Sequence, residues 1–247
     1  MPKFITITMP EVALEYLEEC KNAGLMLCNC SDSNKKLVPT KGEDIVRDYE
    51  NSVGFLIWNL PCRVTCPYAT EACKQFCYAD KAELAYPDCK PSRIRNFEES
   101  REPDFVRRMV YTILRKRKGM RARKLVVRIH ESGDFYNKQY ALAWVRIAWL
   151  ISMYGFTADD ITFIAYTKSF PFFDGLQLPP NFRLRASLDS TSLKYLVDMV
   201  KRNGWCIYRV VDKFTDPENE NNCRCSDCAT CGKCWDLEIR VIECEVH

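Results

Sequence analysis

The segment KLVVRIHESGDFYNKQYALAWVRIAWLISMYGFTADDITFIAYTKSF, residues 124–170, decides the fold of this 247-residue chain. It opens with a short apolar, β-branched run that predicts a strand ending at Gly133. The residues that follow place large apolar side chains on one helical face, and Gly155 is a plausible stop. ITFIAYT, residues 161–167, predicts the next strand. A strand, a helix and a strand in this order are typical of a βαβ unit with parallel strands.

The same alternation continues on both sides of this segment. Further strands are predicted at VGFLIWNLP (53–61), FRLRASLD (182–189) and WCIYRVV (205–211). Further helices are predicted at SRIRNFEESREPDFVRRMVYTILRKRK (92–118), split in two near Pro103, and at STSLKYLVDMVKRNG (190–204), with a Ser or Thr cap and a stop at Gly204. Five strands indicate an α/β fold: a partial (β/α) barrel with parallel strands, plus a cysteine-rich C-terminal metal-binding extension.

These elements suggest three parts along the chain. Residues 1–50 form an N-terminal extension, with a helix predicted at PEVALEYLEECKNAG (10–24) and a polar loop after it. Residues 51–215 form the partial barrel, with a cysteine-rich loop at 62–77 directly after its first strand. Residues 216–247 form the C-terminal cysteine-rich segment.

The composition is that of an ordinary globular chain. Hydrophobic residues make up 47% of it, which suffices for a core that does not need disulfides. The formal net charge of +3 implies no strong overall attraction to nucleic acid. The N-terminus lacks the pattern of a signal peptide, and the most apolar window, ALAWVRIAWLISMYGF, is too short to span a bilayer. We expect a cytoplasmic protein without membrane contact.

In a reducing compartment the 15 cysteines indicate metal binding before disulfides. The densest group is a ladder in CRCSDCATCGKCW with two residues between successive cysteines: Cys225, Cys228, Cys231 and Cys234. Such spacing is closer to iron–sulfur proteins, in which one loop wraps a cluster, than to zinc sites built from two separate pairs. Zinc stays open as an alternative, because Cys223 and Cys244 can complete other ligand sets.

A second group of cysteines, Cys66, Cys73 and Cys77, lies in the loop after the first strand. Three ligands on a four-iron cluster would leave one iron open, as in catalytic metal sites that keep an open coordination position. Cys62 is an alternative fourth ligand, which would close the cluster. Because chemistry in parallel α/β folds gathers at the carboxyl ends of strands, we expect the reaction centre at this upstream group.

The turn HESGDFY follows the second strand of the barrel. Gly133 permits a close backbone approach to a ligand, and Asp134 can pair with an ammonium group. His130 and Glu131 are candidates for proton transfer. The alternative is a plain strand-to-helix turn in which Ser132 or Asp134 caps the next helix.

Four further polar residues lie at the ends of later strands, where they can line a ligand pocket: Lys168, Arg185, Ser187 and Asp189. The run RKRKGMRARK, residues 115–124, carries seven positive charges and no acid. It is either a nucleic-acid contact or, more commonly, a solvated helix end in which cations favour the C-terminus.

The order of these features resembles the radical S-adenosylmethionine enzymes, in which a cysteine-rich loop after the first strand holds a four-iron cluster. In that superfamily an aromatic residue commonly precedes the last cysteine, as in QFC here, and a turn after the second strand binds the methionine amino group, where SGDF (132–135) stands. More narrowly, TCPYATEACKQFCYADKAE, RIHESGDFY and the terminal ladder look like a poorly characterised bacteriophage family of cysteine-rich proteins. This likeness spans roughly residues 28–236.

The resemblance implies one or two 4Fe-4S clusters, S-adenosylmethionine, an electron donor and an unknown substrate, in a host cytoplasm if a phage encodes the chain. The C-x6-C-x3-C spacing departs from the superfamily's C-x3-C-x2-C, and Ser and Asp replace its usual Gly and Glu. We expect an iron–sulfur enzyme in which a reduced cluster on Cys66, Cys73 and Cys77 cleaves the cofactor. Ser132, Gly133, Asp134, Lys168 and Ser187 would bind the cofactor. The alternatives are a zinc-stapled nucleic-acid-binding protein and a non-catalytic iron–sulfur protein.

Overall fold

A computed structural model describes residues 8–32, 52–224 and 228–245 of the chain. Within these residues seven strands form one sheet in the order β1-β2-β3-β4-β5-β6-β7. The strands are β1 (Ser31–Asp32), β2 (Val53–Trp58), β3 (Lys124–Ile129), β4 (Ile161–Thr167), β5 (Phe182–Leu188), β6 (Cys206–Val211) and β7 (Val241–Glu245). Strands β2 to β7 are parallel, and β1 pairs antiparallel with β2. The described sheet does not close on itself, because β1 and β7 are its edges.

Helix α1 (Glu11–Asn22) precedes the described strands, and the other described helical segments lie between them. They are α3 (Glu71–Gln75), α4 (Tyr78–Ala85), α5 (Cys89–Glu99), α6 (Phe105–Gly119), α7 (Lys138–Met153), η2 (Phe170–Phe173), α8 (Lys194–Asn203), α9 (Cys228–Cys231) and η3 (Lys233–Trp235). None of the described helices is long and apolar enough to cross a membrane. The parallel strands and the helices between them confirm the predicted α/β class.

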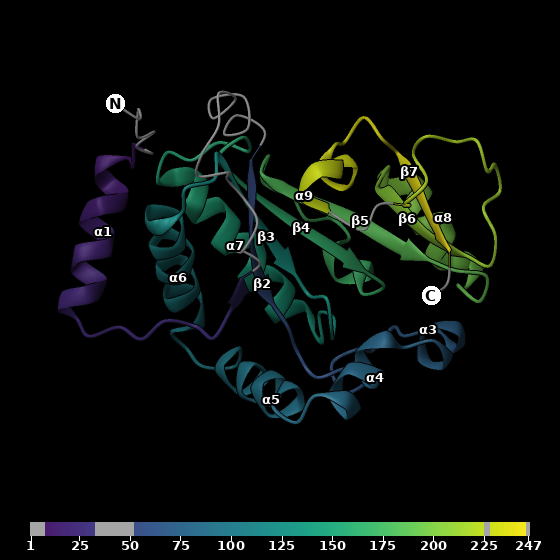
Figure 1. Cartoon of the computed structure of the whole chain (residues 1–247), viewed down its shortest axis with the longest axis horizontal. Coiled ribbons are helices and arrows are strands. Elements are labelled where there is room, and N and C mark those ends of the chain that lie inside the picture. Colours follow the sequence, from purple (N-terminus) through teal and green to yellow (C-terminus); the bar gives the residue numbers. More distant parts are fainter. Residues whose placement is uncertain (1–7, 33–51, 225–227, 246–247) are drawn as a thin grey trace, which may run out of the picture.

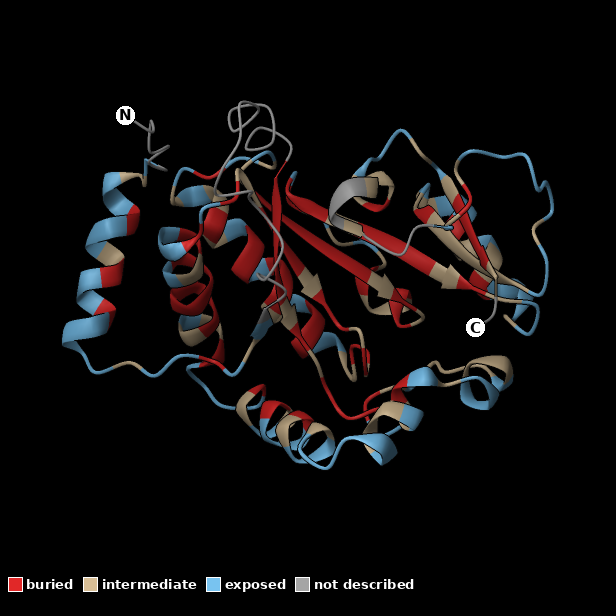
Figure 2. Ribbon diagram, viewed as in Figure 1, coloured by how far each residue is buried: buried red, intermediate tan, exposed pale blue. Residues whose placement is uncertain are grey.

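One face of the sheet carries the larger core. Side chains alternate along each strand, so Leu125, Val127 and Ile129 of β3 point to one side and Val126 to the other. The first side packs against α1, α6, α7 and α8 in a continuous buried cluster. Figure 2 shows the buried residues concentrated in the central strands and on the sides of these helices that face the core, while the outer side of α1 is exposed.

The other face, which we call the inner face, is covered by the C-terminal segment. Val126 and Ile164 pack there with Cys234 and Trp235. Helix α9 contacts β2, and η3 contacts β4, and Figure 1 shows α9 in front of the sheet with α7 behind it. The last connection thus runs over the face opposite to α6, α7 and α8. The prediction of an appended extension misses this, since β7 also adds a parallel strand to the main sheet.

Several local predictions agree with the structure and one does not. Strand β4 has the predicted bounds, and the long basic helix is divided around Pro103 into α5 and α6. Gly204 ends α8 with φ of 61°, the left-handed conformation that glycine adopts at low cost. The predicted Ser or Thr cap of that helix is wrong: its N-cap is Leu193, and no side chain caps it.

Candidate functional site

The cysteine-rich loop begins where β2 ends and returns along the carboxyl edge of the sheet. Thr65 donates its hydroxyl to the Pro61 carbonyl at 2.8 Å, which closes the first turn of the loop. Thr70 then caps α3 by accepting a hydrogen bond from the Cys73 amide at 3.2 Å. Figure 1 shows α3, α4 and α5 along the end of the sheet where the strands terminate. The predicted loop 62–77 thus contains a short helix that carries Cys73.

Hydrogen bonds connect the turn after β3 to the end of β2, where the cysteine-rich loop begins. The Asn59 side-chain oxygen accepts from the amides of Glu131 and Ser132, at 2.7 and 3.0 Å. Gly133 has φ of 79°, and a Cβ there would lie 2.6 Å from both the Leu60 Cβ and the Thr65 Oγ1. Glycine is therefore required because the turn after β3 approaches the cysteine-rich loop closely. The sequence analysis predicts instead a close approach to a ligand.

Asp134 joins the ends of β3 and β4. Its Oδ1 accepts from the Thr167 hydroxyl at 2.5 Å and from the Phe135 amide at 2.8 Å. Its Oδ2 accepts from the amides of Lys168 and Ser169, at 3.0 and 3.1 Å. Burial raises the pKa of Asp134, while these hydrogen bonds oppose the rise. Both oxygens are thus occupied, and the carboxyl group holds the start of the loop after β4.

A second carboxylate, Asp189 at the end of β5, accepts hydrogen bonds from two side chains near the cysteines. Its Oδ2 accepts from the Lys168 ammonium at 2.6 Å and from the Thr70 hydroxyl at 2.5 Å. Both members of the ion pair are largely buried, with 11% and 5% of their side chains exposed. Hydrogen bonds from Lys168 and Thr70 lower the pKa of Asp189 to about 2, so it stays ionised despite its burial.

Cys66, Cys73 and Cys77 come together beside this ion pair. Burial raises the pKa of the Cys66 thiol to about 12, and the charges of Asp134, Cys73 and Cys77 add to the effect. Burial also raises the pKa of Cys73, which the charge of Lys168 opposes and that of Cys77 reinforces. All three thiols are partly exposed, and a main-chain hydrogen bond from Arg63 opposes the rise in the pKa of Cys66. The structure thus places the three predicted upstream ligands near enough for the charge of Cys77 to act on Cys66 and Cys73, but it does not arrange them around a single metal position.

Cys62 has a different environment. It is buried, and its sulfur donates to Asp80 Oδ1 at 3.7 Å, while its amide donates to Glu83 at 3.0 Å. Burial and the charge of Glu83 raise the pKa of its thiol. Carboxylates around a thiol disfavour its anionic, metal-binding form. Its burial and its carboxylate neighbours therefore distinguish Cys62 from the three partly exposed thiols, although the charge of Cys77 also raises its pKa.

The other predicted residues of the turn after β3 are engaged by contacts within the protein. His130 is buried against Phe135 and Tyr140, its Nε2 is 2.9 Å from the Tyr140 hydroxyl, and burial lowers its pKa to about 3. Glu131 pairs with Arg128 at 2.8 Å. Ser132 is buried and donates to the Leu60 carbonyl at 2.9 Å.

Ser187 lies on β5 opposite Tyr208 of β6, and it is half-buried. Arg185, two residues earlier on the same strand, is fully buried, and its guanidinium donates to main-chain carbonyls of the C-terminal segment. Two residues that the sequence analysis did not single out, Thr70 and Thr167, complete the hydrogen-bond network. The position of Thr70, directly before the helical stretch EACKQ, is the signal that could have identified it as a cap.

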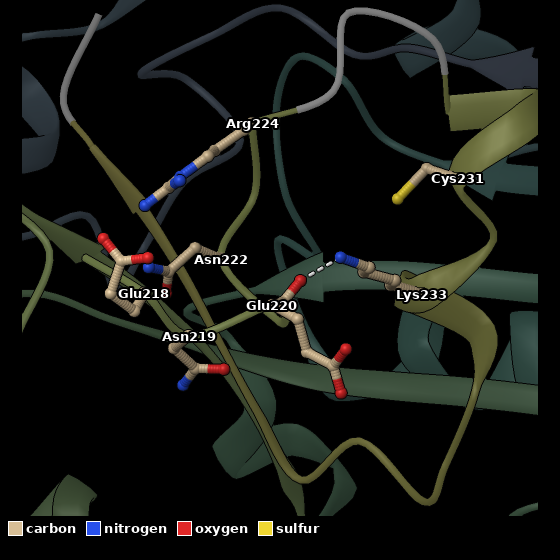
Figure 3. Close-up of a pocket in the computed structure, with 7 residues that line it drawn as sticks. All are labelled: Glu218, Asn219, Glu220, Asn222, Arg224, Cys231 and Lys233. Atoms are coloured by element: carbon tan, nitrogen blue, oxygen red, sulfur yellow. Dashed lines mark hydrogen bonds between the residues drawn. The ribbon is translucent and has the colours of Figure 1, made fainter. Parts of the chain in front are cut away.

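The three described cysteines of the terminal ladder lie in two different surroundings, and the ladder as a metal site stays a prediction. Cys225 lies outside the described residues. Cys228 and Cys234 pack on the inner face, whereas Cys231 lines a separate polar pocket of about 360 Å³ with Arg224 and Lys233. Figure 3 shows Lys233 reaching the Glu220 carbonyl across this pocket. Among the described residues, no three His, Cys, Asp or Glu side chains are already arranged to hold a single metal ion.

The basic run 115–124 is far from the cysteine cluster along the strands. It joins the end of α6 to the start of β3, whereas the cysteines follow the ends of the strands. Arg117 is buried and donates to the carbonyls of Ala122 and Arg123, at 2.8 and 2.7 Å. Arg123 pairs with Asp160 at 3.0 Å. Part of the run is therefore engaged in holding the turn between α6 and β3.

Comparison with known proteins places the chain in a family. Residues 29–237 match the family model described as Gene product 88. The Gene 88 proteins of Mycobacterium phages D29 and L5 are each 31% identical to the chain over 137 residues. That alignment covers 52% of this chain and 52% of each relative, so the chain spans about half the length of the curated relatives it matches. No solved structure matches the chain. The chain belongs to the Gene product 88 family.

Proposed function

We propose that this protein is an iron–sulfur enzyme in which Cys66, Cys73 and Cys77 hold a four-iron cluster and S-adenosylmethionine is reductively cleaved. The observation that carries the proposal is that these three thiols lie in the loop at the carboxyl ends of parallel strands, close enough for the charge of Cys77 to raise the pKa of Cys66 and Cys73. Sites in parallel α/β sheets are built at this edge. The raised pKa values of Cys66 and Cys73 mean that a bound positive group is needed to ionise these two thiols at neutral pH.

The residues beside the thiols suit an amino-acid group. Lys168 and Asp189 present a cation and an anion 2.6 Å apart, next to Cys73. The methionine moiety of the cofactor carries a carboxylate and an ammonium, which this pair complements. Asp134 supports the arrangement by fixing the Lys168 amide, and Gly133 lets the β3 turn meet the cysteine loop. When bound, a reduced four-iron cluster supplies the electron for cleavage of the sulfonium.

The first experiment is anaerobic purification with measurement of iron and acid-labile sulfide. We expect brown protein in which Cys77→Ala lowers the iron and sulfide content, while Cys89→Ala, a partly exposed cysteine at the start of α5, leaves both unchanged. Colourless protein that contains only zinc would refute the cluster. Equal iron in the two variants would remove Cys77 from the ligand set.

The second experiment tests the reaction itself. Protein loaded with iron and sulfide is mixed with dithionite and S-adenosylmethionine, and 5′-deoxyadenosine is measured. We expect the product from the parent chain and none from Cys77→Ala. Lys168→Met should keep its iron but raise the concentration of S-adenosylmethionine needed for half-maximal product. Fully loaded protein that yields no 5′-deoxyadenosine would contradict the proposal.

A further inference from the structure

The inner face of the sheet gathers four other thiols from the C-terminal segment. Cys234, in η3, is buried, and Cys223 and Cys228 pack with it around Tyr166 and Tyr208. The fourth, Cys244, belongs to β7. Because it lies two residues after Ile242, which packs on the inner face, its side chain points to the same side.

Main-chain pairing fixes the positions of two of these thiols. The Cys223 amide donates to the Glu243 carbonyl at 2.7 Å, which draws the chain before the ladder alongside β7. The side chains of Cys223 and Cys244 interact directly, and both reach the Tyr208 hydroxyl. Cys234 in turn senses the charges of Cys223 and Cys228, and its sulfur contacts the Tyr166 hydroxyl. The four thiols therefore form one group with two tyrosine hydroxyls beside it.

The charge around this group is positive. Arg185 is fully buried on β5, and its charge acts directly on Cys234. Its guanidinium donates to the carbonyls of Ile239 at 2.9 Å, Lys233 at 3.0 Å and Asp236 at 2.6 Å. It also donates to the Cys234 carbonyl. The charge of Cys228 also acts on Arg128 of β3, although Arg128 already has a carboxylate partner in Glu131. Buried cations need compensating negative charge, and ionised thiolates around a metal supply it.

We propose that Cys223, Cys228, Cys234 and Cys244 form a four-thiolate metal centre that fastens the C-terminal segment to the inner face of the sheet. This ligand set differs from the ladder predicted from the sequence spacing. Cys223 and Cys244, which lie outside the ladder, take the places of Cys225 and Cys231. Cys231 instead borders the polar pocket with Arg224 and Lys233. The thiols would close inwards on binding, and the tyrosine hydroxyls would act as hydrogen-bonding partners of the sulfurs. This inference does not depend on the function proposed above.

The test is the metal and sulfide content of the anaerobically purified full chain and its Ser variants. We expect Cys223→Ser and Cys244→Ser each to lose the equivalent of one centre, whether one zinc ion or the iron and sulfide of one cluster. Cys231→Ser should keep the parent content, and Cys77→Ala should leave this centre in place. Loss in Cys231→Ser and Cys225→Ser, with retention in Cys223→Ser and Cys244→Ser, would overturn the inference in favour of the ladder.

A measurement on the unsubstituted chain covers the case in which the Ser variants do not fold. The chain is treated with iodoacetamide before and after chelation, and the labelled cysteines are identified by mass spectrometry. We expect the four proposed ligands to be protected before chelation and modified at least tenfold faster after it, with Cys231 modified at a similar rate in both. Protection that chelation does not change at Cys223 and Cys244 would exclude the centre.

Discussion

Thr70 and Asp189 lie 119 residues apart in the chain and share a hydrogen bond of 2.5 Å. Through it the N-terminus of α3 is held against the end of β5, and the same hydroxyl accepts the Cys73 amide. One side chain therefore fixes both the local helix that carries a candidate ligand and its place on the sheet.

We expect Thr70→Val to destabilise the protein by about 1–2 kcal/mol, because it removes a helix cap and a bond to a buried carboxylate. Denaturant unfolding checks this value. Thr70→Ser, which keeps the hydroxyl, should restore most of the loss. If the Val and Ser variants unfold at the same denaturant concentration, the hydroxyl does not hold the loop.

Gly133→Ala should be more costly than alanine at an open glycine. The new Cβ would lie 2.6 Å from Leu60 and Thr65, in a backbone conformation with φ of 79°. We expect a loss of about 2–5 kcal/mol, from the left-handed backbone and the overlap together. Gly175→Ala is the matched control, because its φ is 75° and nothing lies within 4 Å of its Cβ position.

That control should lose only the backbone term, about 1–2 kcal/mol. Thermal or denaturant unfolding of the two variants under the same conditions separates the two contributions. Equal losses would show that the β3 turn and the cysteine loop are not in close contact.

His130 should make stability depend on pH. Burial lowers its pKa to about 3, whereas an unfolded histidine titrates near 6.5. The unfolded state therefore binds the proton first, so stability is complete above about pH 6.5 and falls towards pH 3, by up to about 1.4 kcal/mol per pH unit. Asp189, whose pKa is about 2, loses its own contribution only at lower pH, mainly below about pH 4.

The histidine contribution is isolated by His130→Asn, since asparagine tolerates the φ of 69° at this position. We expect the free energy of unfolding of the variant to vary less between pH 6.5 and 4 than that of the parent chain. Parallel pH profiles for the two proteins would show that His130 is not the group responsible.

Arg185→Lys tests the attachment of the C-terminal segment to the inner face. The substitution keeps the positive charge but removes the planar group that reaches four carbonyls. We expect a loss of about 2–5 kcal/mol in the free energy of unfolding and faster proteolysis within residues 228–240.

Arg183→Lys is the control on the same strand, because Arg183 is half-buried and bonds the Trp235 carbonyl at 3.1 Å. It should lose less than about 1 kcal/mol. If Arg183→Lys destabilises the chain as much as Arg185→Lys, the buried guanidinium is not the main attachment.

The sequence was sufficient to predict the elements whose pattern is local. The apolar run of β4 and the single-faced pattern of α7 were visible in their own residues. Strand β7, with the short sequence VIECE, was missed because its identity depends on pairing with β6. Strand β1 has only two described residues and leaves no periodic pattern to detect.

The position of the cysteine loop was predictable from the sequence but its supporting contacts were not, and the ligand set stays a prediction. The cysteine loop could be placed at the strand ends from chain order alone. Asp134 was expected to face a ligand, yet both its oxygens bond the residues at the end of β4, which only the sheet register brings near. For the same reason, spacing grouped Cys231 with its neighbours, whereas the fold groups Cys223 and Cys244 with Cys234.

Because residues 228–245 cover the inner face, most of the sheet is synthesised before the segment that covers it. Phe55, Val126 and Ile164 leave the ribosome long before the segment that shields them. At translation rates of roughly 5–20 residues per second, an apolar strip on a nearly finished sheet stays open to solvent for several seconds. Exposed apolar surface of this kind favours aggregation of nascent chains, and the arrival of residues 228–245 ends that exposure.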